Sequence, residues 1–158
     1  MSNLNQIGLD KEKSKAIILH LNELLADYSI FYQNTRGFHW NIKGDKFFEL
    51  HDKFEDLYGD LYNSIDEIAE RIKMLGGIPN HNFTDYAKVT SIKESGLVSD
   101  GKKAVEEILE AFKIILAKQR NILEASAQAD DEGTNALMSD YISKQEKLVW
   151  MYSSFLGI

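Results

Sequence analysis

The chain has no cysteine and only one proline among its 158 residues. Without cysteine there is neither a disulfide framework nor a thiolate metal site. No stretch approaches the ~18 apolar residues of a membrane span, and the first residues, MSNLNQIGLDKEKSK, lack the apolar core of a secretory signal. We therefore expect a soluble, cytoplasmic protein, and the scarcity of proline favours long helices.

Positive charge is also scarce, because 18 Lys and Arg stand against 25 Asp and Glu, for a net charge of −7. Sequence-independent binding to DNA depends on Lys and Arg that neutralise phosphates. Lys11, Lys13 and Lys15 resemble a basic arm, but Asp10 and Glu12 alternate with them and nearly cancel their charge. We interpret this segment as a solvated helix start and do not expect direct binding to DNA or to a membrane.

Apolar residues recur at intervals of three and four along most of the chain, which is typical of amphipathic helices. The pattern predicts one helix over residues 9–40 and a second over residues 46–75, joined by a short turn at residues 41–45. A short turn makes the two helices antiparallel neighbours. The stripe expected to face the core in the second helix consists of Leu50, Phe54, Leu57, Leu61, Ile65, Ile68, Ile72 and Leu75.

A long connection follows Gly76-Gly77-Ile78-Pro79, which ends the second helix, and it runs to Ser99. Within it, residues 84–89 are expected to form a short helix capped by Thr84. The third long helix begins with Ser99 or Asp100 as its cap, and the turn at residues 130–134 separates it from a fourth.

The resulting order of short, long and short connections predicts an all-α fold, in which one domain covers residues 1–158. The expected architecture is a ferritin-like four-helix bundle with one long crossover, and a short helix lies on that crossover between the second and third long helices. Di-iron bundles of this class place a Glu-x-x-His motif on helices that face the interior, and this sequence has none. The absence argues against a metal site inside one bundle.

Five potential metal ligands lie elsewhere, namely His39, His51, Glu55, Asp66 and Glu70. At about 100° per residue, the last four fall within an arc of roughly 100° on the second helix, and the arc is centred about 130° from the apolar stripe. Imidazole and carboxylate ligands together suit iron or manganese. We therefore expect a metal site on a flank of the bundle.

The same spacing prevents one copy of the chain from completing that site. Asp66 lies about 16 to 22 Å along the helix axis from Glu55 and His51, whereas one ion needs ligands within roughly 2 Å. An antiparallel two-fold partner brings the His51 end of one helix against the Glu70 end of the other. We hypothesise two half-sites per chain and a metal site shared between subunits.

These residues stand in segments that resemble the Dps family of mini-ferritins, the DNA-protecting proteins of starved cells. The resemblance rests on Arg36-Gly37-Phe38-His39-Trp40-Asn41, Phe47-Phe48-Glu49-Leu50-His51, Asp66-Glu67-Ile68-Ala69-Glu70-Arg71-Ile72, Gly76-Gly77-Ile78-Pro79, Glu146-Lys147-Leu148-Val149-Trp150-Met151 and Ser154-Phe155-Leu156. It extends over nearly the whole chain.

The resemblance implies a homo-oligomer, a dodecameric hollow shell that oxidises iron(II) at its two-fold interfaces, preferably with hydrogen peroxide, and stores ferric mineral. By the same resemblance, His39 and His51 are the catalytic histidine ligands of one subunit, while Asp66 and Glu70 are the carboxylate ligands of its mate. Glu55 either binds iron directly or holds a second metal through water, since many relatives have aspartate there. Trp40 matches a tryptophan beside the site.

Other residues and functions remain open at this stage. Residues 130–132 and Asp140 either line a cation pore or form solvated caps. His20 and His81 lack carboxylates at helical spacing and are expected at the surface. The alternative functions are a nucleoid DNA-compacting protein with secondary iron binding and a helical scaffold without metal chemistry.

Overall fold

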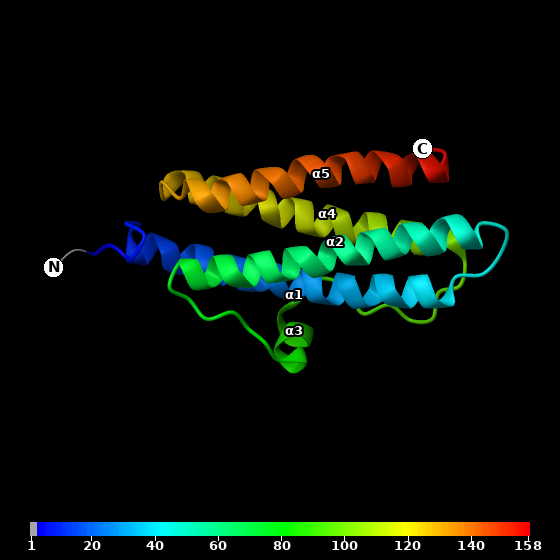
Figure 1. Ribbon diagram of the computed structural model, residues 1–158, viewed down its shortest axis with the longest axis horizontal. Helices are drawn as coiled ribbons and strands as arrows, with labels where there is room; N and C mark the ends of the chain where they lie inside the picture. The colour runs from blue at the N-terminus through cyan, green and yellow to red at the C-terminus, as the bar shows by residue number, and fades with distance from the viewer. Residues whose placement is uncertain (1–2) are drawn as a thin grey trace.

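The computed structural model describes residues 3–158, and its long helices form the four-helix bundle shown in Figure 1. The helices are α1 (Lys11–Asn41), α2 (Phe47–Met74), α3 (Phe83–Val89), α4 (Gly101–Gln128) and α5 (Glu132–Leu156). Within residues 3–158 the only β-type pairing is an isolated bridge between Leu4 and Asp10. The predicted all-α fold is therefore confirmed, with one crossover that carries α3. No helix in the described part of the chain is long and apolar enough to cross a membrane.

The first two helices form an antiparallel hairpin that positions the candidate ligands. Asp10 caps α1, because its carboxylate accepts hydrogen bonds from the backbone N–H groups of Glu12 and Lys13. Gly44 takes a φ of 114° in the connecting turn, a left-handed conformation that favours glycine. The hairpin matches the predicted helices to within two residues at each end.

The predicted apolar stripe of α2 does face the core. Seven of its eight members are buried, and Ile65 is half-buried against the same cluster. The stripe belongs to a buried apolar cluster that α1 and α4 also share, and Phe38 of α1 contacts Phe54 of the stripe with ring centroids 6.2 Å apart. Burial of this one face leaves the remaining faces of α2 available for other contacts.

The caps of the later helices are partly as predicted. Asp100 caps α4 by accepting from the backbone N–H of Lys103. The short helix α3, however, begins after Asn82 rather than after Thr84, and Thr84 lies inside it. The prediction of a Thr84 cap was therefore wrong, and Asn82 makes no side-chain capping bond in its place.

A buried carboxylate holds the crossover against the bundle. Asp27 is fully buried on α1 and accepts hydrogen bonds from the Thr90 hydroxyl and the Ser91 backbone N–H, while the Lys118 ammonium of α4 pairs with it. The charge of Asp27 is thus neutralised and its oxygens are hydrogen-bonded, as burial requires. This contact fixes where the crossover leaves α3.

Polar groups also meet in the interior between the long helices. The Tyr28 hydroxyl donates to the Gln119 side-chain oxygen, the Gln119 amide donates to Gln145, and the Gln145 amide donates back to the Tyr28 oxygen. All three residues are buried and none is charged. The bundle interior is therefore closed by a neutral ring of hydrogen bonds.

Candidate metal centre

The two histidines lie face to face across the α1–α2 hairpin. The His39 and His51 rings are stacked, with centroids 3.8 Å apart and planes 14° from parallel. The Nδ1 atom of His39 lies 2.7 Å from the carbonyl oxygen of His51, and the Nδ1 atom of His51 lies 2.8 Å from the carbonyl oxygen of His39. This reciprocal pairing fixes the orientation of both rings.

The pairing also fixes the tautomer of each ring. A carbonyl oxygen only accepts hydrogen bonds, so Nδ1 must carry the hydrogen in both histidines. In a neutral imidazole the proton is then absent from Nε2, whose lone pair is free to bind a metal. Backbone carbonyls commonly orient metal-binding histidines in this way.

Stacking separates the positions at which the two histidines can bind. Each Nε2 lone pair lies in the plane of its own ring, and the two planes are only 14° from parallel, with the ring centroids 3.8 Å apart. One ion within roughly 2.1 Å of both nitrogens would lie well out of at least one ring plane. The geometry therefore suits two neighbouring ions better than one.

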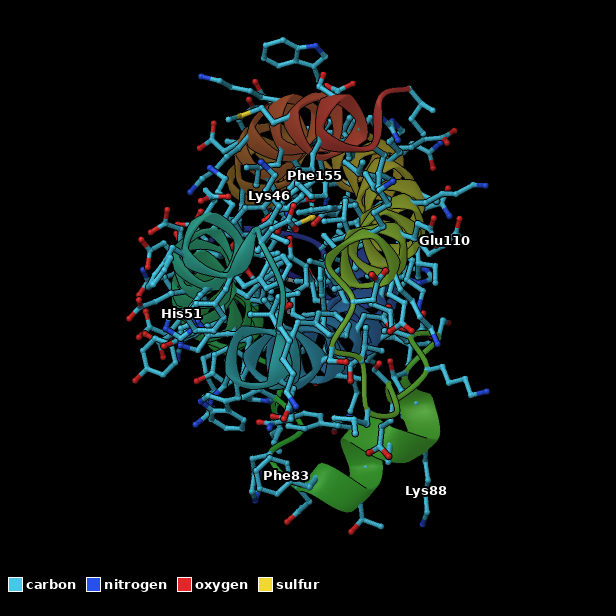
Figure 2. The ribbon with its side chains drawn as sticks, turned by 90° about the vertical axis from the view of Figure 1, so that its right-hand side faces the viewer. Lys46, His51, Phe83, Lys88, Glu110 and Phe155 are labelled. Atoms are coloured by element: carbon cyan, nitrogen blue, oxygen red, sulfur yellow. The ribbon has the colours of Figure 1, made fainter. Side chains whose placement is uncertain are left out.

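Aromatic residues support the histidine pair on both sides. Phe47 stacks on His51 with a centroid distance of 4.9 Å, and Tyr58 meets the His39 ring edge-on at 5.3 Å. His39 is buried, whereas His51 is half-buried. Figure 2 shows His51 on the outer flank of α2, turned away from the bundle interior.

The predicted carboxylates lie along the same helix but do not reach the histidines. Glu55, Asp66 and Glu70 are all exposed, and the described chain offers them no ion-pair partner. Within residues 3–158, no three His, Asp or Glu side chains gather closely enough to hold a metal ion. One copy of the chain thus presents a histidine pair and, farther along α2, a separate carboxylate pair.

Trp40 stands next to this region on α1. Its indole is exposed and lies under the Arg36 guanidinium, whose central carbon is 4.7 Å from the ring centroid. The same guanidinium lies 5.4 Å from the Tyr32 ring, which in turn contacts Tyr58 at 6.0 Å. Cation–π contact of this kind holds the exposed indole in place.

Sequence reasoning missed Tyr58 as part of this site. It was not among the residues expected at the metal site, although it lies seven residues after His51 and so falls within about 20° of it on the helical wheel. That spacing was a usable signal. The hydrogen bonds between each histidine and the other's carbonyl could not be predicted from the sequence, because they depend on the register of α1 against α2.

The acidic residues of the turn between α4 and α5 lie in different environments. Asp131 is buried, pairs with the Arg71 guanidinium at 2.7 Å, and caps α5 by accepting from the backbone N–H of Thr134. It is therefore not available to line a pore, whereas Asp130, Glu132 and Asp140 are exposed.

The two remaining histidines are exposed, as expected for surface residues. His20 does have a carboxylate at helical spacing, contrary to the expectation, since its Nδ1 atom lies 3.6 Å from Glu23. His81 belongs to the loop before α3 and contributes to a cavity beside Trp40.

The chain is similar to proteins of a known family. A model of the ferritin-like domain matches residues 18–158. The DNA protection during starvation protein of Porphyromonas gingivalis is 43% identical over 152 residues, which is 96% of each chain. An uncharacterized protein of Haemophilus influenzae is 50% identical over 148 residues, covering 94% of this chain and 92% of that one.

Solved structures agree with the sequence relatives. The Dps protein of Vibrio cholerae, described as a member of the ferritin-like diiron-carboxylate proteins, superposes with a TM-score of 0.97 at 51% identity and covers 99% of this chain and 98% of its own. A Dps protein of Bacillus brevis gives a TM-score of 0.89 at 30% identity, with coverage of 92% and 97%. The similarity therefore extends through every helix, including the hairpin that carries the histidines.

Proposed function

The chain belongs to the Dps proteins of the ferritin-like family, and we propose that it oxidises iron(II) at sites shared between two-fold related subunits. The ferric product is stored as mineral inside a hollow shell, for which we propose a dodecamer in the bacterial cytoplasm. Removal of iron(II) and peroxide protects DNA from oxidative damage without requiring contact with it. Iron is here the substrate and the cargo.

The observation that carries this proposal is the histidine pair itself. Both Nδ1 atoms are committed to backbone carbonyls, so both Nε2 atoms are left to bind iron(II). A half-site of neutral imidazoles needs anionic ligands to stabilise the ferric product. Asp66 and Glu70 are exposed on the same helix and are the ligands that a partner copy would supply.

An apolar cavity beside the site supports a partner copy at this flank. The cavity has a volume of about 860 Å³, and its lining includes Trp40, Tyr62, Phe83 and Leu97. These four side chains are strongly exposed in the single chain, with Phe83 at 88%, and Figure 2 shows Phe83 projecting outward from α3. Exposed aromatic clusters of this kind are typical of protein interfaces.

Two adjacent ions also suit hydrogen peroxide as the oxidant. Each iron(II) gives up one electron, and peroxide takes two electrons and two protons to become two molecules of water. A pair of irons therefore completes the reduction of peroxide without releasing hydroxyl radical. We expect a consumption of two iron(II) per peroxide, measured by anaerobic titration.

Subunit exchange tests the shared site directly. His51→Ala removes one half-site and Asp66→Ala removes the other, so each variant alone is inactive. After random exchange, half of the two-fold pairs are mixed and one of their two sites is intact, so about one quarter of the wild-type activity returns. A site built within one chain predicts no recovery, and that result would refute the proposal.

A matched control uses two variants of the same half-site. A mixture of His39→Ala with His51→Ala contains no chain with an intact histidine pair, so exchange should restore nothing. Recovery in this control would show that exchange restores activity for reasons other than complementation.

The structure favours iron chemistry over DNA compaction. Residues 5–9 form a turn held against the end of α2, because the Asn5 side chain accepts hydrogen bonds from the backbone N–H groups of Ile7 and Leu9 and donates one to the Leu75 carbonyl. Lys13 donates to the Gln128 carbonyl and Lys15 pairs with Glu12. Tight binding of DNA in a gel shift at low salt without magnesium would reverse this preference.

A further inference from the structure

A third ring continues the stack that the two histidines form. Phe47 is the first residue of α2 and lies four positions before His51, so the two side chains share one face of the helix. The Phe47 ring stacks on the His51 ring with a centroid distance of 4.9 Å and planes 21° apart. Within the described chain Phe47 makes no ring contact with His39, so Phe47 and His39 lie on opposite faces of His51. His51 is thus the middle ring of three.

The two histidines are held in place by different contacts. His39 is only 8% exposed, and Tyr58 meets its ring edge-on. His51 is half-buried, and among the described residues only His39 and Phe47 make ring contacts with it. A hydrogen bond at Nδ1 directs that one nitrogen but lets the ring rock about the bond, whereas packing on both faces prevents rocking. The direction of the Nε2 lone pair of His51 therefore depends on Phe47.

Phe47 is itself anchored in the bundle. Its half-buried ring packs against the buried apolar cluster of the core, whereas the ring of the next residue, Phe48, is 75% exposed. Lys46 stands at the cap position of α2 without a side-chain capping bond. The packing of Phe47 therefore secures the first turn of α2 and connects the core to the position of His51.

Loss of the Phe47 ring should affect one of two adjacent iron(II) ions. The His39 ring would stay in place, because its Nδ1 atom bonds to a backbone carbonyl that a substitution at residue 47 does not remove. The His51 ring would be free to rock and would bind its ion more weakly. A single iron(II) gives peroxide one electron, which yields hydroxide and a hydroxyl radical, whereas two irons and two protons yield two molecules of water.

We propose that Phe47 is a positioning residue, which holds His51 ready for the second of two adjacent iron(II) ions. It thereby determines that peroxide is reduced by two electrons and not by one. This role rests on the proposed function, because it presupposes that the histidine pair binds iron(II).

The first measurement involves no oxidation. Iron(II) is added anaerobically to the assembled protein, and calorimetry should show two ions per histidine pair in the wild type. Phe47→Leu supplies an apolar side chain without a flat face, so it should bind one ion as before and the second roughly 10- to 100-fold more weakly. Phe47→Met should behave in the same way. Phe47→Tyr keeps the ring and should bind both ions like the wild type.

The second measurement identifies the product of peroxide. With a spin trap present, electron paramagnetic resonance should detect severalfold more hydroxyl radical from Phe47→Leu than from the wild type or from Phe47→Tyr. Circular dichroism verifies that each variant is folded, and Phe47→Met replaces Phe47→Leu if the latter is not.

Phe48→Leu is the matched control, because it makes the same change one residue later. The Phe48 ring contacts Phe47 but does not contact His51 within the described chain. This variant should bind two ions and release no additional radical. The proposal is overturned if Phe47→Leu keeps both ions, or if Phe48→Leu or Phe47→Tyr loses the second one. A wild type that binds no iron(II) would instead overturn the proposed function, and the role of Phe47 with it.

Discussion

The bundle interior and the outer flank of α2 both contain polar side chains, but the two regions handle them in opposite ways. In the interior, Tyr28, Gln119 and Gln145 form a closed ring in which each group donates once to the next. On the flank, His39 and His51 satisfy one nitrogen each and leave the other free. A closed ring stabilises the fold, whereas an open pair can bind a ligand.

The difference follows from the cost of burying charge. Charged ligands inside the bundle would need partners or a metal at all times, because removing one member of a buried ionic set costs several kcal/mol. Neutral amides and a phenol carry no such requirement. Carboxylates on the exposed flank remain hydrated until a ligand arrives, so we expect the chain to fold without iron.

The largest expected effect is a loss of iron(II) oxidation when a ligand on the flank is replaced. Glu70→Gln removes one anionic ligand without changing shape, and the rate of iron(II) oxidation should fall more than ~100-fold, beyond the 10- to 100-fold effect of outer-shell partners. Stability should change by less than about 0.5 kcal/mol, because Glu70 is exposed and unpaired. Stopped-flow absorbance and urea denaturation measure the two quantities.

Glu67→Gln is the control for this substitution. Glu67 is also an exposed glutamate of α2, but it lies on the side of α2 that faces α5, where it accepts a hydrogen bond from the Tyr141 hydroxyl. Its neutralisation should leave oxidation unchanged. Wild-type rates in Glu70→Gln would remove Glu70 from the site.

The interior should show the reverse pattern. Gln119→Leu breaks two of the three bonds in the ring and leaves buried groups of Tyr28 and Gln145 unpaired, so we expect a loss of about 3 kcal/mol with iron oxidation intact. Replacing the whole ring, as Tyr28→Phe with Gln119→Leu and Gln145→Leu, should recover much of that loss. Denaturation at a fixed protein concentration provides the test, because assembly contributes to stability.

A loss of iron oxidation in Gln119→Leu without unfolding would contradict the separation of the two regions. So would a triple variant less stable than the single one, since it would show that the ring contributes more than the cost of its unpaired members.

Alkaline pH should lower the free energy of unfolding through the buried tyrosines of the interior, and this effect is smaller than that of Gln119→Leu. Burial raises the pKa of Tyr28 above its ordinary value of 10.0, and burial followed by the nearby charges raises that of Tyr141. Unfolding lets these phenols ionise, so their contribution is fully present below pH 10 and declines as pH rises above it. Each phenol should account for about 1.4 kcal/mol per pH unit.

Tyr28→Phe checks this slope. Its unfolding free energy should fall less steeply above pH 10 than that of the wild type, even though the variant is less stable at neutral pH. Equal slopes would mean that Tyr28 ionises in the folded protein.

How far the sequence predicts these features depends on the range of the interactions. The apolar stripe of α2 follows from spacing within one helix and is observed. Of the two residues predicted as possible caps of α4, Ser99 and Asp100, the structure shows Asp100. The start of α3 was misplaced because Asn82 and Thr84 are both plausible caps by residue type. Local chemistry could not choose between them.

Contacts between segments far apart in the chain could not be predicted from the sequence. Asp131 was grouped with its acidic neighbours because Arg71, its partner, stands 60 positions earlier. The His39 and His51 bonds to each other's carbonyls require the register of the hairpin. The ligand types were nonetheless identified from the sequence, since they share one arc of α2, and their assembly into a shared centre stays a prediction.

The smallest effect concerns the packing that keeps the flank site in order. Tyr58 meets His39 edge-on, and its hydroxyl makes no hydrogen bond within the described chain. Tyr58→Phe keeps the ring, so the oxidation rate should stay within about twofold of the wild type. Tyr58→Ala removes the ring and frees His39 to turn, which should slow oxidation severalfold through weaker iron(II) binding, seen as a raised KM with little change in kcat. A large loss in Tyr58→Phe would instead show that the hydroxyl itself takes part in the chemistry, and the flank would then contain a further reactive group besides its ligands.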